Sequence, residues 1–469
     1  MNKHLQPFQT SPALKSAVKG ITWPAIYRPD TAQYLAMQFW LDQSQWLSGE
    51  ELRERQFRQA QGLLEHAAAT VPYYRDSFRA AGVIPGKGFI MDYWPGIPLL
   101  KRVTLQQQAT TLLSRQIPPS HGKTTTVTTS GSTGTPVTVT KTQLMQFFLD
   151  CIKLRDVAWG RLDTGKKLAV IRLVKNRKAA RPPDGLHHNG WGKPFDQLYN
   201  TSSSSLLNIE TPVIDQAGWL GREDPDYLLT FPTNLNALAQ FLGNNNQSLP
   251  NLQQIMTIGE CLSPDVRAVC EEFFQVPIKD VYSSQELGYI ALQCPDHPNY
   301  HVQSETVLVE VLDDNDQPCQ AGEVGRLVVT SLHNFAMPLI RYEVGDYAEV
   351  GGPCPCGRGL PVLNRIYGRV RNMLTLPSGE KTWPRIGSQY YAASTGAAIR
   401  QAQVIQHSLE QIEVRLAVDR PLNEQQEARL TPLIREALGH PFSISYCYLD
   451  EIPRSKGGKF EEFLSHIGT

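Results

Sequence analysis

The sequence has no net charge, since lysine plus arginine and aspartate plus glutamate number 45 each. Such a balance gives no general field for nucleic acid or an anionic membrane surface, so we expect neither partner. No stretch approaches the ~18 apolar residues of a membrane span, and residues 1–20 lack the apolar segment of a secretory signal. Eight cysteines in 469 residues are too few for a disulfide scaffold and indicate a reducing compartment. We therefore expect a cytoplasmic enzyme.

The chain is too long for one ordinary core, which predicts at least two domains. Residues 1–120 are predicted to be mostly helical. Within them, residues 50–69 are rich in helix formers and place five apolar side chains on one face: Phe57, Ala60, Leu63, Leu64 and Ala67. Val71-Pro72 is expected to end this helix.

From about Thr124 onward, strand-like and helical segments alternate, which predicts α/β layers. The expected strands are residues 167–174, 252–259 and 277–284, and residues 264–274 are an expected helix. Residues 306–329 are strand-like around a turn at 313–316, which predicts a β-rich subdomain.

The last hundred residues are predicted to form a compact α+β unit. Residues 411–419 and 442–449 alternate as strands do. The helix expected between them has Leu430, Leu433, Ile434 and Leu438 on one face and Gly439 as its C-cap. The predicted fold is thus a large N-terminal layered α/β domain, residues 1–369, followed by a small α+β domain, residues 370–469.

A loop rich in hydroxyl groups and glycine, TTSGSTGTP, spans residues 128–136. Its glycines allow successive N–H groups to point into one concavity, and the hydroxyls add donors, so the loop suits phosphate oxygens. Strand-like residues flank it on both sides, and Gly134 is followed by Thr135-Pro136 rather than by Lys-Ser/Thr at a helix start. The nucleoside-triphosphatase P-loop is therefore excluded. A polar hairpin turn is the alternative interpretation of the loop alone.

The loop resembles the phosphate loop of the adenylate-forming superfamily, which includes acyl-CoA synthetases, adenylation domains and luciferase. Five further segments resemble that superfamily's motifs in the same order: MTIGECL at 256–262, VYSSQELG at 281–288, LIRYEVGDYAEV at 339–350, RIYGRVRNML at 365–374 and IPRSKGGKF at 452–460. Three more segments are similar to phenylacetate–CoA ligase and its relatives: VPYYR at 71–75, PLIRY at 338–342 and GPCPCGR at 352–358.

The resemblance implies an enzyme that joins a carboxylate to AMP, releases pyrophosphate and passes the acyl group to a thiol. Lys459 and Glu286 would be catalytic, with Glu286 also holding Mg²⁺. The residues implied for ATP or AMP are Thr129, Ser130, Gly131, Ser132, Thr133, Gly134, Gly259, Glu260, Tyr282, Ser283, Ser284, Asp346 and Arg369. Tyr282 would cover the adenine, Ser284 would meet the α-phosphate, and Asp346 would accept from the ribose hydroxyls.

The resemblance also implies that the C-terminal domain is mobile and carries the lysine loop. The hinge motif departs from the superfamily, because Gly368-Arg369-Val370 is followed by Arg371-Asn372 where acidic residues are usual. Residues 383–387, Trp-Pro-Arg-Ile-Gly, also depart from the usual pattern in a region that lines the thiol tunnel of relatives. Coenzyme A is the expected acceptor. A carrier-protein phosphopantetheine or an amine remains an alternative, as does a non-catalytic relative that binds nucleotide or acyl ligand.

Two short pairs of soft ligands, Cys294-x-x-His297 and Cys354-x-Cys356, predict a structural zinc site. His301 is an alternative ligand. Free cysteines in a reducing cytosol are the other interpretation of these pairs.

The acyl pocket is expected beside the helix that follows the phosphate loop. Phe148 and Ile152 on that helix, with Gly259, would form a slot for an aromatic or medium aliphatic acid, although the same residues also suit a core. The expected partners are that small carboxylic acid and coenzyme A or an acyl carrier protein, and the expected assembly is a monomer or a homodimer.

Overall fold

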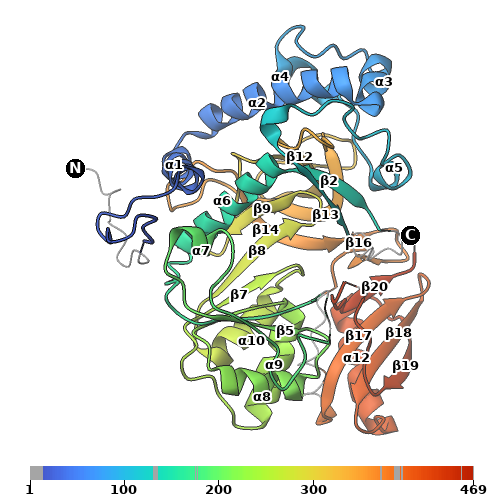
Figure 1. Ribbon diagram of the computed structural model, residues 1–469. Coiled ribbons are helices and arrows are strands. Elements are labelled where there is room, and N and C mark those ends of the chain that lie inside the picture. The colour runs from blue at the N-terminus through green and yellow to red at the C-terminus, as the bar shows by residue number, and fades with distance from the viewer. Residues whose placement is uncertain are drawn as a thin grey trace.

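A twelve-stranded mixed sheet runs through the centre of the molecule (Figure 1). The computed structural model describes residues 14–129, 136–174, 176, 178–369, 372–384, 391, 395–455 and 457–467. The strand order of the sheet is β11-β12-β13-β14-β10-β9-β8-β7-β6-β3-β5-β4. Its strands are β3 (Leu168–Arg172), β4 (Leu186–His188), β5 (Ser204–Asn208), β6 (Tyr227–Thr230), β7 (Gln254–Ile258), β8 (Ile278–Ser284), β9 (Gly288–Gln293), β10 (Tyr300–Val302), β11 (Val307–Leu312), β12 (Val324–Ser331), β13 (Tyr342–Val350) and β14 (Val362–Arg369).

The described part of the first 120 residues is mostly helical, as predicted. Its helices are α1 (Pro29–Ser44), α2 (Gly49–Thr70), α3 (Pro72–Ala80), α4 (Ile90–Tyr93), α5 (Arg102–Gln107) and two short 3₁₀ turns, Trp94–Gly96 and Pro119–His121. Ser48 caps α2 in a capping box with Glu51. The five apolar side chains predicted for one face of α2 are all buried. Val71 ends α2, and Pro72 begins α3 at once, because proline is favoured in the first turn of a helix.

One half of the sheet has the parallel α/β arrangement that the alternating pattern predicts. Strands β5, β3, β6, β7 and β8 are parallel neighbours. The expected strands at 167–174, 252–259 and 277–284 are β3, β7 and β8, and the expected helix at 264–274 is α10 (Pro264–Phe274). A core of buried apolar side chains joins these strands to α8 (Val213–Glu223), α9 (Pro232–Asn244) and α10. The short helix α7 (Phe195–Leu198) precedes β5.

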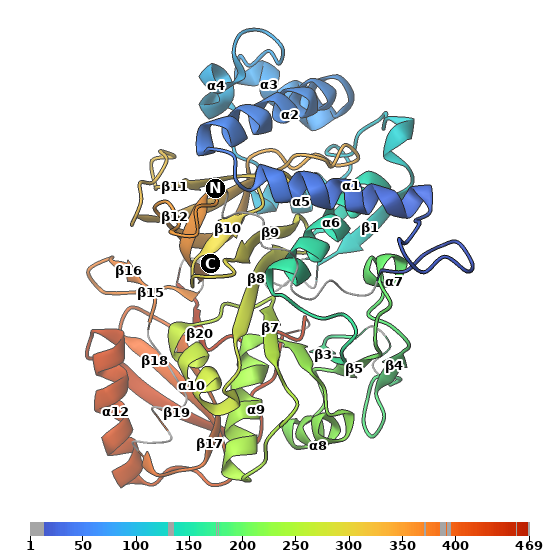
Figure 2. The ribbon, with the colours of Figure 1, turned by 90° about the vertical axis from the view of Figure 1, so that its left-hand side faces the viewer.

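The other half of the sheet is antiparallel and includes the segment predicted to be β-rich. Strands β8 to β10 and β11 to β14 pair antiparallel, so the β-rich segment continues the central sheet. A second core lies between these strands and the helices α2 and α3. Figure 2 shows these helices above that end of the sheet.

The predicted strands on either side of the hydroxyl-rich loop form a separate hairpin. β1 (Thr124–Thr128) pairs with β2 (Thr138–Thr142) from Thr124 opposite Thr142 to Thr128 opposite Thr138. Thr142 then caps α6 (Gln143–Trp159) by accepting from the N–H of Met145. Residues 130–135 of the loop lie outside the described residues.

The C-terminal residues form a small α+β unit with its own core. Its sheet has the order β19-β18-β17-β20, from β17 (Ile399–Gln406), β18 (Gln411–Val418), β19 (Ser443–Leu449) and β20 (Phe463–Ser465). Helix α12 (Glu424–Leu438) buries Leu430, Ile434 and Leu438, and Gly439 ends it in the left-handed conformation. Leu433 remains 40% exposed, unlike its predicted role on the apolar face. The two short strands β15 (Leu374–Thr375) and β16 (Lys381–Thr382) precede this sheet.

The C-terminal unit lies beside the parallel half of the large sheet (Figures 1 and 2). The predicted boundary near residue 370 stays a prediction, because residues 370 and 371 lie outside the described part. Among the described residues, no helix is both long enough and apolar enough to span a bilayer.

Candidate active site

Two of the sequence motifs follow neighbouring parallel strands. Gly259 and Glu260 come directly after β7, and Tyr282, Ser283 and Ser284 end β8, which pairs parallel with β7. The carboxyl ends of parallel strands meet at one edge of a sheet, where ligands of open α/β folds bind. The two motifs, separated in sequence by helix α10, therefore share one edge.

A second pair of motifs is joined to this edge through Asp346. Asp346 on β13 lies opposite Arg369 on β14, with Arg369 Nε 3.5 Å from Asp346 Oδ1. The Tyr282 hydroxyl donates to Asp346 Oδ2 at 2.7 Å. Burial raises the pKa of Tyr282 well above its usual range, and the Asp346 charge adds to the effect, so the phenol stays a donor. Three residues predicted from three separate motifs thus form one polar cluster.

Glu286 is buried after β8 and is held by an arginine that no motif indicated. Arg102 Nη1, at the start of α5, donates to Glu286 Oε1 at 2.8 Å. The same guanidinium donates to the Tyr342 hydroxyl at 3.3 Å and to Thr129 Oγ1 at 3.5 Å. Thr129 is the second residue of the hydroxyl-rich loop and the last described one before residue 130. Arg102 therefore connects that loop to the predicted magnesium ligand.

Lys141 is a second buried cation that no sequence motif indicated. It lies on β2 just after the loop and donates to the carbonyl oxygen of Gln285 at 2.7 Å. Burial lowers the pKa of Lys141 to about 8, and the neighbouring Glu286 charge opposes this shift. The region around Glu286 is therefore rich in positive charge, as a site for phosphate oxygens requires.

Lys459 of the C-terminal unit reaches the same region. Burial lowers the pKa of Lys459, and the carboxylates of Asp346, Glu260 and Glu286 oppose that shift. Arg369 also contributes, by lowering the pKa. A lysine predicted from the last motif thus lies in the electrostatic field of four charged residues from the other motifs.

Two glycines permit this close approach. Gly259 has φ of +88°, and a Cβ there would lie 3.1 Å from the Phe231 ring and 3.9 Å from Lys459 Cε. Gly458, at φ of +76°, would place a Cβ 2.9 Å from Ile209 Cγ2. Both positions favour glycine for conformation and for space. The lysine loop fits against the sheet edge because neither position carries a side chain.

The remaining predicted phosphate ligands are only partly described. Thr129 Oγ1 accepts from the N–H of Val137 at 2.9 Å, which closes the base of the loop. Ser130, Gly131, Ser132, Thr133 and Gly134 lie outside the described residues. Ser284 Oγ accepts from the N–H of Leu287 at 3.0 Å, and Ser283 pairs with Tyr289 in the β8–β9 ladder.

The residues predicted for the acyl pocket contact different neighbours. Ile152 is fully buried in a core with Leu41 and Val281. Phe148 stacks on His333, with ring centroids 3.8 Å apart and an interplanar angle of 15°. Gly259 instead adjoins Phe231. Helix α6 points different side chains to different neighbours, and its sequence alone does not separate a core face from a lining face.

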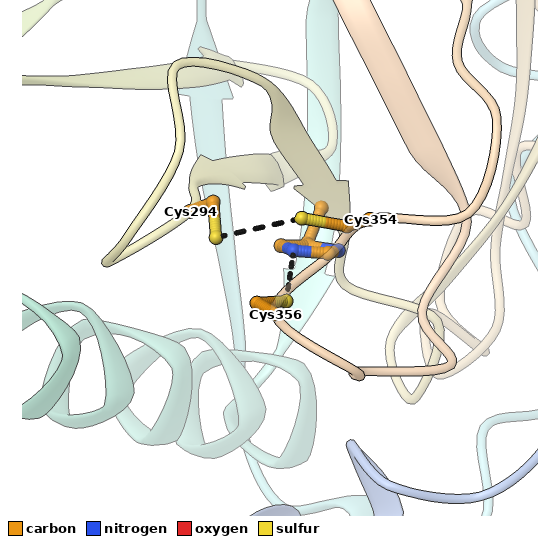
Figure 3. A group of neighbouring side chains, drawn as sticks. Cys294, Cys354 and Cys356 are labelled. Atoms are coloured by element: carbon orange, nitrogen blue, oxygen red, sulfur yellow. Dashed lines mark hydrogen bonds between the residues drawn. The ribbon is translucent and has the colours of Figure 1, made fainter.

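Three of the four predicted zinc ligands come together, with a different histidine. Cys294, His301, Cys354 and Cys356 place their ligand atoms within 4.8 Å of one another (Figure 3). The sulfurs of Cys294 and Cys354 are 3.8 Å apart, and Cys356 Sγ lies 3.3 Å from His301 Nε2. Two thiolates bound to one tetrahedral zinc at about 2.3 Å are separated by about 3.8 Å, so the geometry fits.

The histidine in the group is His301, not His297. His301 lies on β10, which pairs with both β9 and β14, so the ladder directs it toward the loop that carries Cys354 and Cys356. Its Nδ1 is 3.4 Å from the Leu360 carbonyl oxygen, and burial lowers its pKa to about 4, which leaves Nε2 neutral. His297 lies in the turn between β9 and β10, outside the group.

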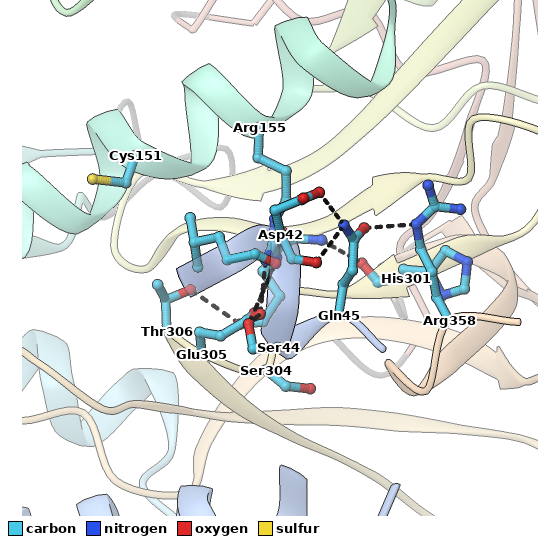
Figure 4. Close-up of polar contacts among 12 residues, drawn as sticks. Asp42, Ser44, Gln45, Cys151, Arg155, His301, Ser304, Glu305, Thr306 and Arg358 are labelled. Atoms are coloured by element: carbon cyan, nitrogen blue, oxygen red, sulfur yellow. Dashed lines mark hydrogen bonds and ion pairs between the residues drawn. The ribbon is translucent and has the colours of Figure 1, made fainter. Parts of the chain in front are cut away.

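The cysteine loop is anchored by its arginine to the residues that follow α1. Arg358 Nε donates to Gln45 Oε1 at 2.8 Å, and Arg358 also stacks over the rings of Trp46 and Trp159. Close by, Arg155 pairs with Glu305 at 2.7 Å (Figure 4). These contacts join segments far apart in sequence, which is a structural role.

Residues 388–465 match the family model described as the CapK C-terminal domain. Across 457 residues the chain is 25% identical to the phenylacetate-coenzyme A ligase of Thermus thermophilus, and the match covers 89% of this chain and 97% of that protein. The match thus extends over nearly the whole length of both proteins.

Solved structures of 2-hydroxyisobutyryl-CoA ligase share the fold. In its postadenylation state, with 2-HIB-AMP bound, that ligase matches with a TM-score of 0.71 at 17% identity, over 90% of this chain and 91% of its own. In its thioesterification state, with 2-HIB-AMP and CoA, the TM-score is 0.60 at 18% identity over the same shares.

Proposed function

Because the chain belongs to the adenylate-forming superfamily, close to phenylacetate–CoA ligase, we propose that it is an ATP-dependent carboxylic acid ligase. It forms an acyl-AMP, releases pyrophosphate and transfers the acyl group to the thiol of coenzyme A. The observation that carries this proposal is that the lysine loop of the C-terminal unit lies against the motif after β7: a Cβ on Gly259 would lie 3.9 Å from Lys459 Cε, and the Phe460 N–H donates to Glu260.

In the first half-reaction, a carboxylate oxygen of the acid forms a bond to the α-phosphorus of ATP while the bond to the pyrophosphate oxygen breaks. Negative charge moves from the carboxylate to the phosphate oxygens, and a lysine beside both stabilises that redistribution. The low dielectric around Lys459 strengthens the interaction. Lys459 is accordingly assigned to this step.

The adenosine is assigned to the cluster of Tyr282, Asp346 and Arg369. A carboxylate accepts from both ribose hydroxyls, and the arginine beside it meets the ribose or the α-phosphate. The phosphate chain is assigned to the loop at 129–134, and Arg102 and Lys141 add positive charge near it.

Glu286 is proposed to hold the magnesium ion that accompanies ATP. A hard cation prefers carboxylate and phosphate oxygens, and Glu286 Oε1 already lies next to the end of the phosphate loop through Arg102. When bound, Mg²⁺ neutralises charge on the departing pyrophosphate. Arg102 would orient the Glu286 carboxylate for binding of the magnesium ion.

A zinc ion is proposed for Cys294, His301, Cys354 and Cys356. The fit of the sulfur and nitrogen positions to a tetrahedral site supports it. The ion would join the β9–β10 turn to the loop before β14, which is a structural role.

The acid is proposed to be aromatic or medium aliphatic. The buried ring of Phe231, next to Gly259 and the lysine loop, supports an apolar wall for the acid, and Ile152 is buried in a separate core. For the acceptor, a carrier-protein phosphopantetheine or an amine remains the second candidate, because residues 383–387 depart from the superfamily pattern. None of the eight cysteines forms a disulfide in the described part of the chain, which supports a reducing compartment, proposed to be the cytoplasm.

The proposal is tested by ATP–pyrophosphate exchange with a panel of carboxylic acids, followed by addition of coenzyme A. Exchange with at least one acid, and an acyl-CoA product, are expected. Exchange without an acyl-CoA product assigns the acceptor to a carrier protein or an amine. No exchange with any acid, where a known ligase is active, contradicts the proposal and favours a nucleotide-binding relative.

A further inference from the structure

The loop that carries Lys459 is tied to the large domain by the carboxylate of Glu260. The backbone N–H of Phe460 donates to Glu260 Oε1 at 2.7 Å. The other oxygen, Oε2, accepts from the N–H and the hydroxyl of Thr233, at 3.1 and 2.7 Å. The Glu260 side chain is only 5% exposed. Both carboxylate oxygens of Glu260 therefore accept hydrogen bonds from this chain. One of the donors, the N–H of Phe460, belongs to the residue that follows Lys459.

Arg454 adds a second connection between the same segments. Its Nη1 lies 3.9 Å from Glu260 Oε1 and donates to Thr233 Oγ1 at 3.2 Å. It also donates to the carbonyl oxygen of Gly458 at 3.3 Å. Burial lowers the pKa of Arg454, and the Glu260 charge opposes the shift. Arg454 thus spans the lysine loop and the first turn of α9.

These contacts fix Lys459 from both sides. Gly458 before it is held by Arg454 and packs against Ile209, and Phe460 after it is held by Glu260. A hydrogen bond to a buried charged group stabilises more than one between neutral groups. The contacts join the C-terminal unit to the segment after β7 and to α9 of the large domain, so they require the C-terminal unit to be docked against that domain.

We propose that Glu260 is a positioning residue that latches the lysine loop for adenylation, with Thr233 and Arg454 as its partners, and that it is not a nucleotide ligand. The inference rests on the proposed function for its consequence, because the latch matters by placing Lys459. The latch must open before the C-terminal unit can take up another arrangement for thiol transfer. Glu260 therefore favours the first half-reaction at the expense of the second.

The first test needs no activity. Hydrogen–deuterium exchange of the full-length protein without substrates, followed in the peptide around Phe460, reports the N–H that donates to Glu260. Glu260→Ala should speed exchange there by about tenfold or more, because a hydrogen bond to a buried charge is lost. Glu272→Ala, an exposed glutamate on α10, is the matched control and should change nothing. Unchanged protection in Glu260→Ala would overturn the latch.

The second test separates the two half-reactions in Glu260→Gln. Glutamine has nearly the same shape but offers one acceptor oxygen, so it satisfies only one side of the latch. Pyrophosphate exchange should fall about ten- to a hundredfold. Transfer from chemically made acyl-AMP to coenzyme A should be unchanged or faster. Arg454→Met should likewise lower pyrophosphate exchange and leave acyl transfer unchanged or faster. Agreement between the two variants would show that the result does not come from a folding defect in one of them.

Several outcomes contradict the latch. Equal loss in both half-reactions indicates damage to the fold, and a rise in the KM for ATP with unchanged kcat makes Glu260 a nucleotide ligand after all. If the wild type adenylates no acid, the proposed function fails, while the exchange experiment still decides whether Glu260 holds the loop.

Discussion

The hydroxyl of Tyr282 donates a 2.7 Å hydrogen bond to Asp346, which joins the end of β8 to the middle of β13. In this structure the phenol donates to an oxygen that the proposed function assigns to the ribose. Binding of AMP therefore exchanges a protein donor for ligand donors at Asp346. The exchange predicts opposite effects for the two side chains.

Asp346→Ala should weaken AMP binding by about tenfold or more, because two hydrogen bonds to a charged acceptor are lost. Tyr282→Phe should leave the affinity unchanged or raise it slightly, because Asp346 Oδ2 is then free before AMP binds. Isothermal titration calorimetry with AMP measures both. If Tyr282→Phe weakens binding as much as Asp346→Ala does, the phenol and not the carboxylate is the main nucleotide contact.

The zinc prediction distinguishes His301, the expected ligand in this structure, from His297. Protein washed with chelator should retain one zinc per chain by elemental analysis, and His301→Ala should lose it, whereas His297→Ala should keep it. Cys354→Ser should lower the thermal midpoint by several degrees before it affects turnover, because the ion would connect two loops away from the phosphates.

Cys447→Ser is the control, since Cys447 lies on β19 outside the group. Retention of zinc by His301→Ala together with its loss in His297→Ala would restore the ligand set expected from the sequence. Absence of zinc from washed wild-type protein would remove the site.

The raised pKa of Glu462 leads us to expect that the free energy of unfolding depends on pH. Burial raises its pKa to about 7, and the charges of Glu260 and Asp265 add to the shift. The folded protein therefore keeps a proton that the unfolded chain releases above its ordinary pKa of 4.5. The free energy of unfolding should fall as the pH rises from about 4.5 to about 7, and then level off.

Glu462→Gln removes this titration, so the variant should be more stable than the wild type at pH 8, by about 1–3 kcal/mol. The advantage should shrink or vanish at pH 5, where the wild-type carboxyl is protonated. Urea unfolding at both pH values measures it. An equal difference at pH 5 and pH 8 would mean that the charge of Glu462 is not the cause.

Much of the architecture could be predicted because local patterns determine it. The buried face of α2, the strands β7 and β8, helix α10 and the Gly439 cap all follow from periodicity and helix-end chemistry. The motifs also identified Tyr282, Asp346, Arg369 and Lys459, which long-range folding then brings together.

Other features depend on tertiary contacts that no local pattern encodes. Arg102 and Lys141 belong to no motif, and their roles arise from where α5 and β2 lie relative to Glu286. His301 rather than His297 joins the cysteines because strand pairing, not spacing, sets its direction. Ile152 and Phe148 are one helical turn apart yet contact a core and His333, respectively.

The central claim, that Lys459 serves acyl-AMP formation, is tested by measuring both half-reactions in Lys459→Ala. Pyrophosphate exchange should fall by about a hundredfold or more, the scale of losing a charge partner of the transition state. Transfer of the acyl group from chemically made acyl-AMP to coenzyme A should persist near the wild-type rate. Lys456→Ala, three residues earlier, is the control and should retain both activities. Equal loss in both half-reactions, or no loss in either, would contradict the account.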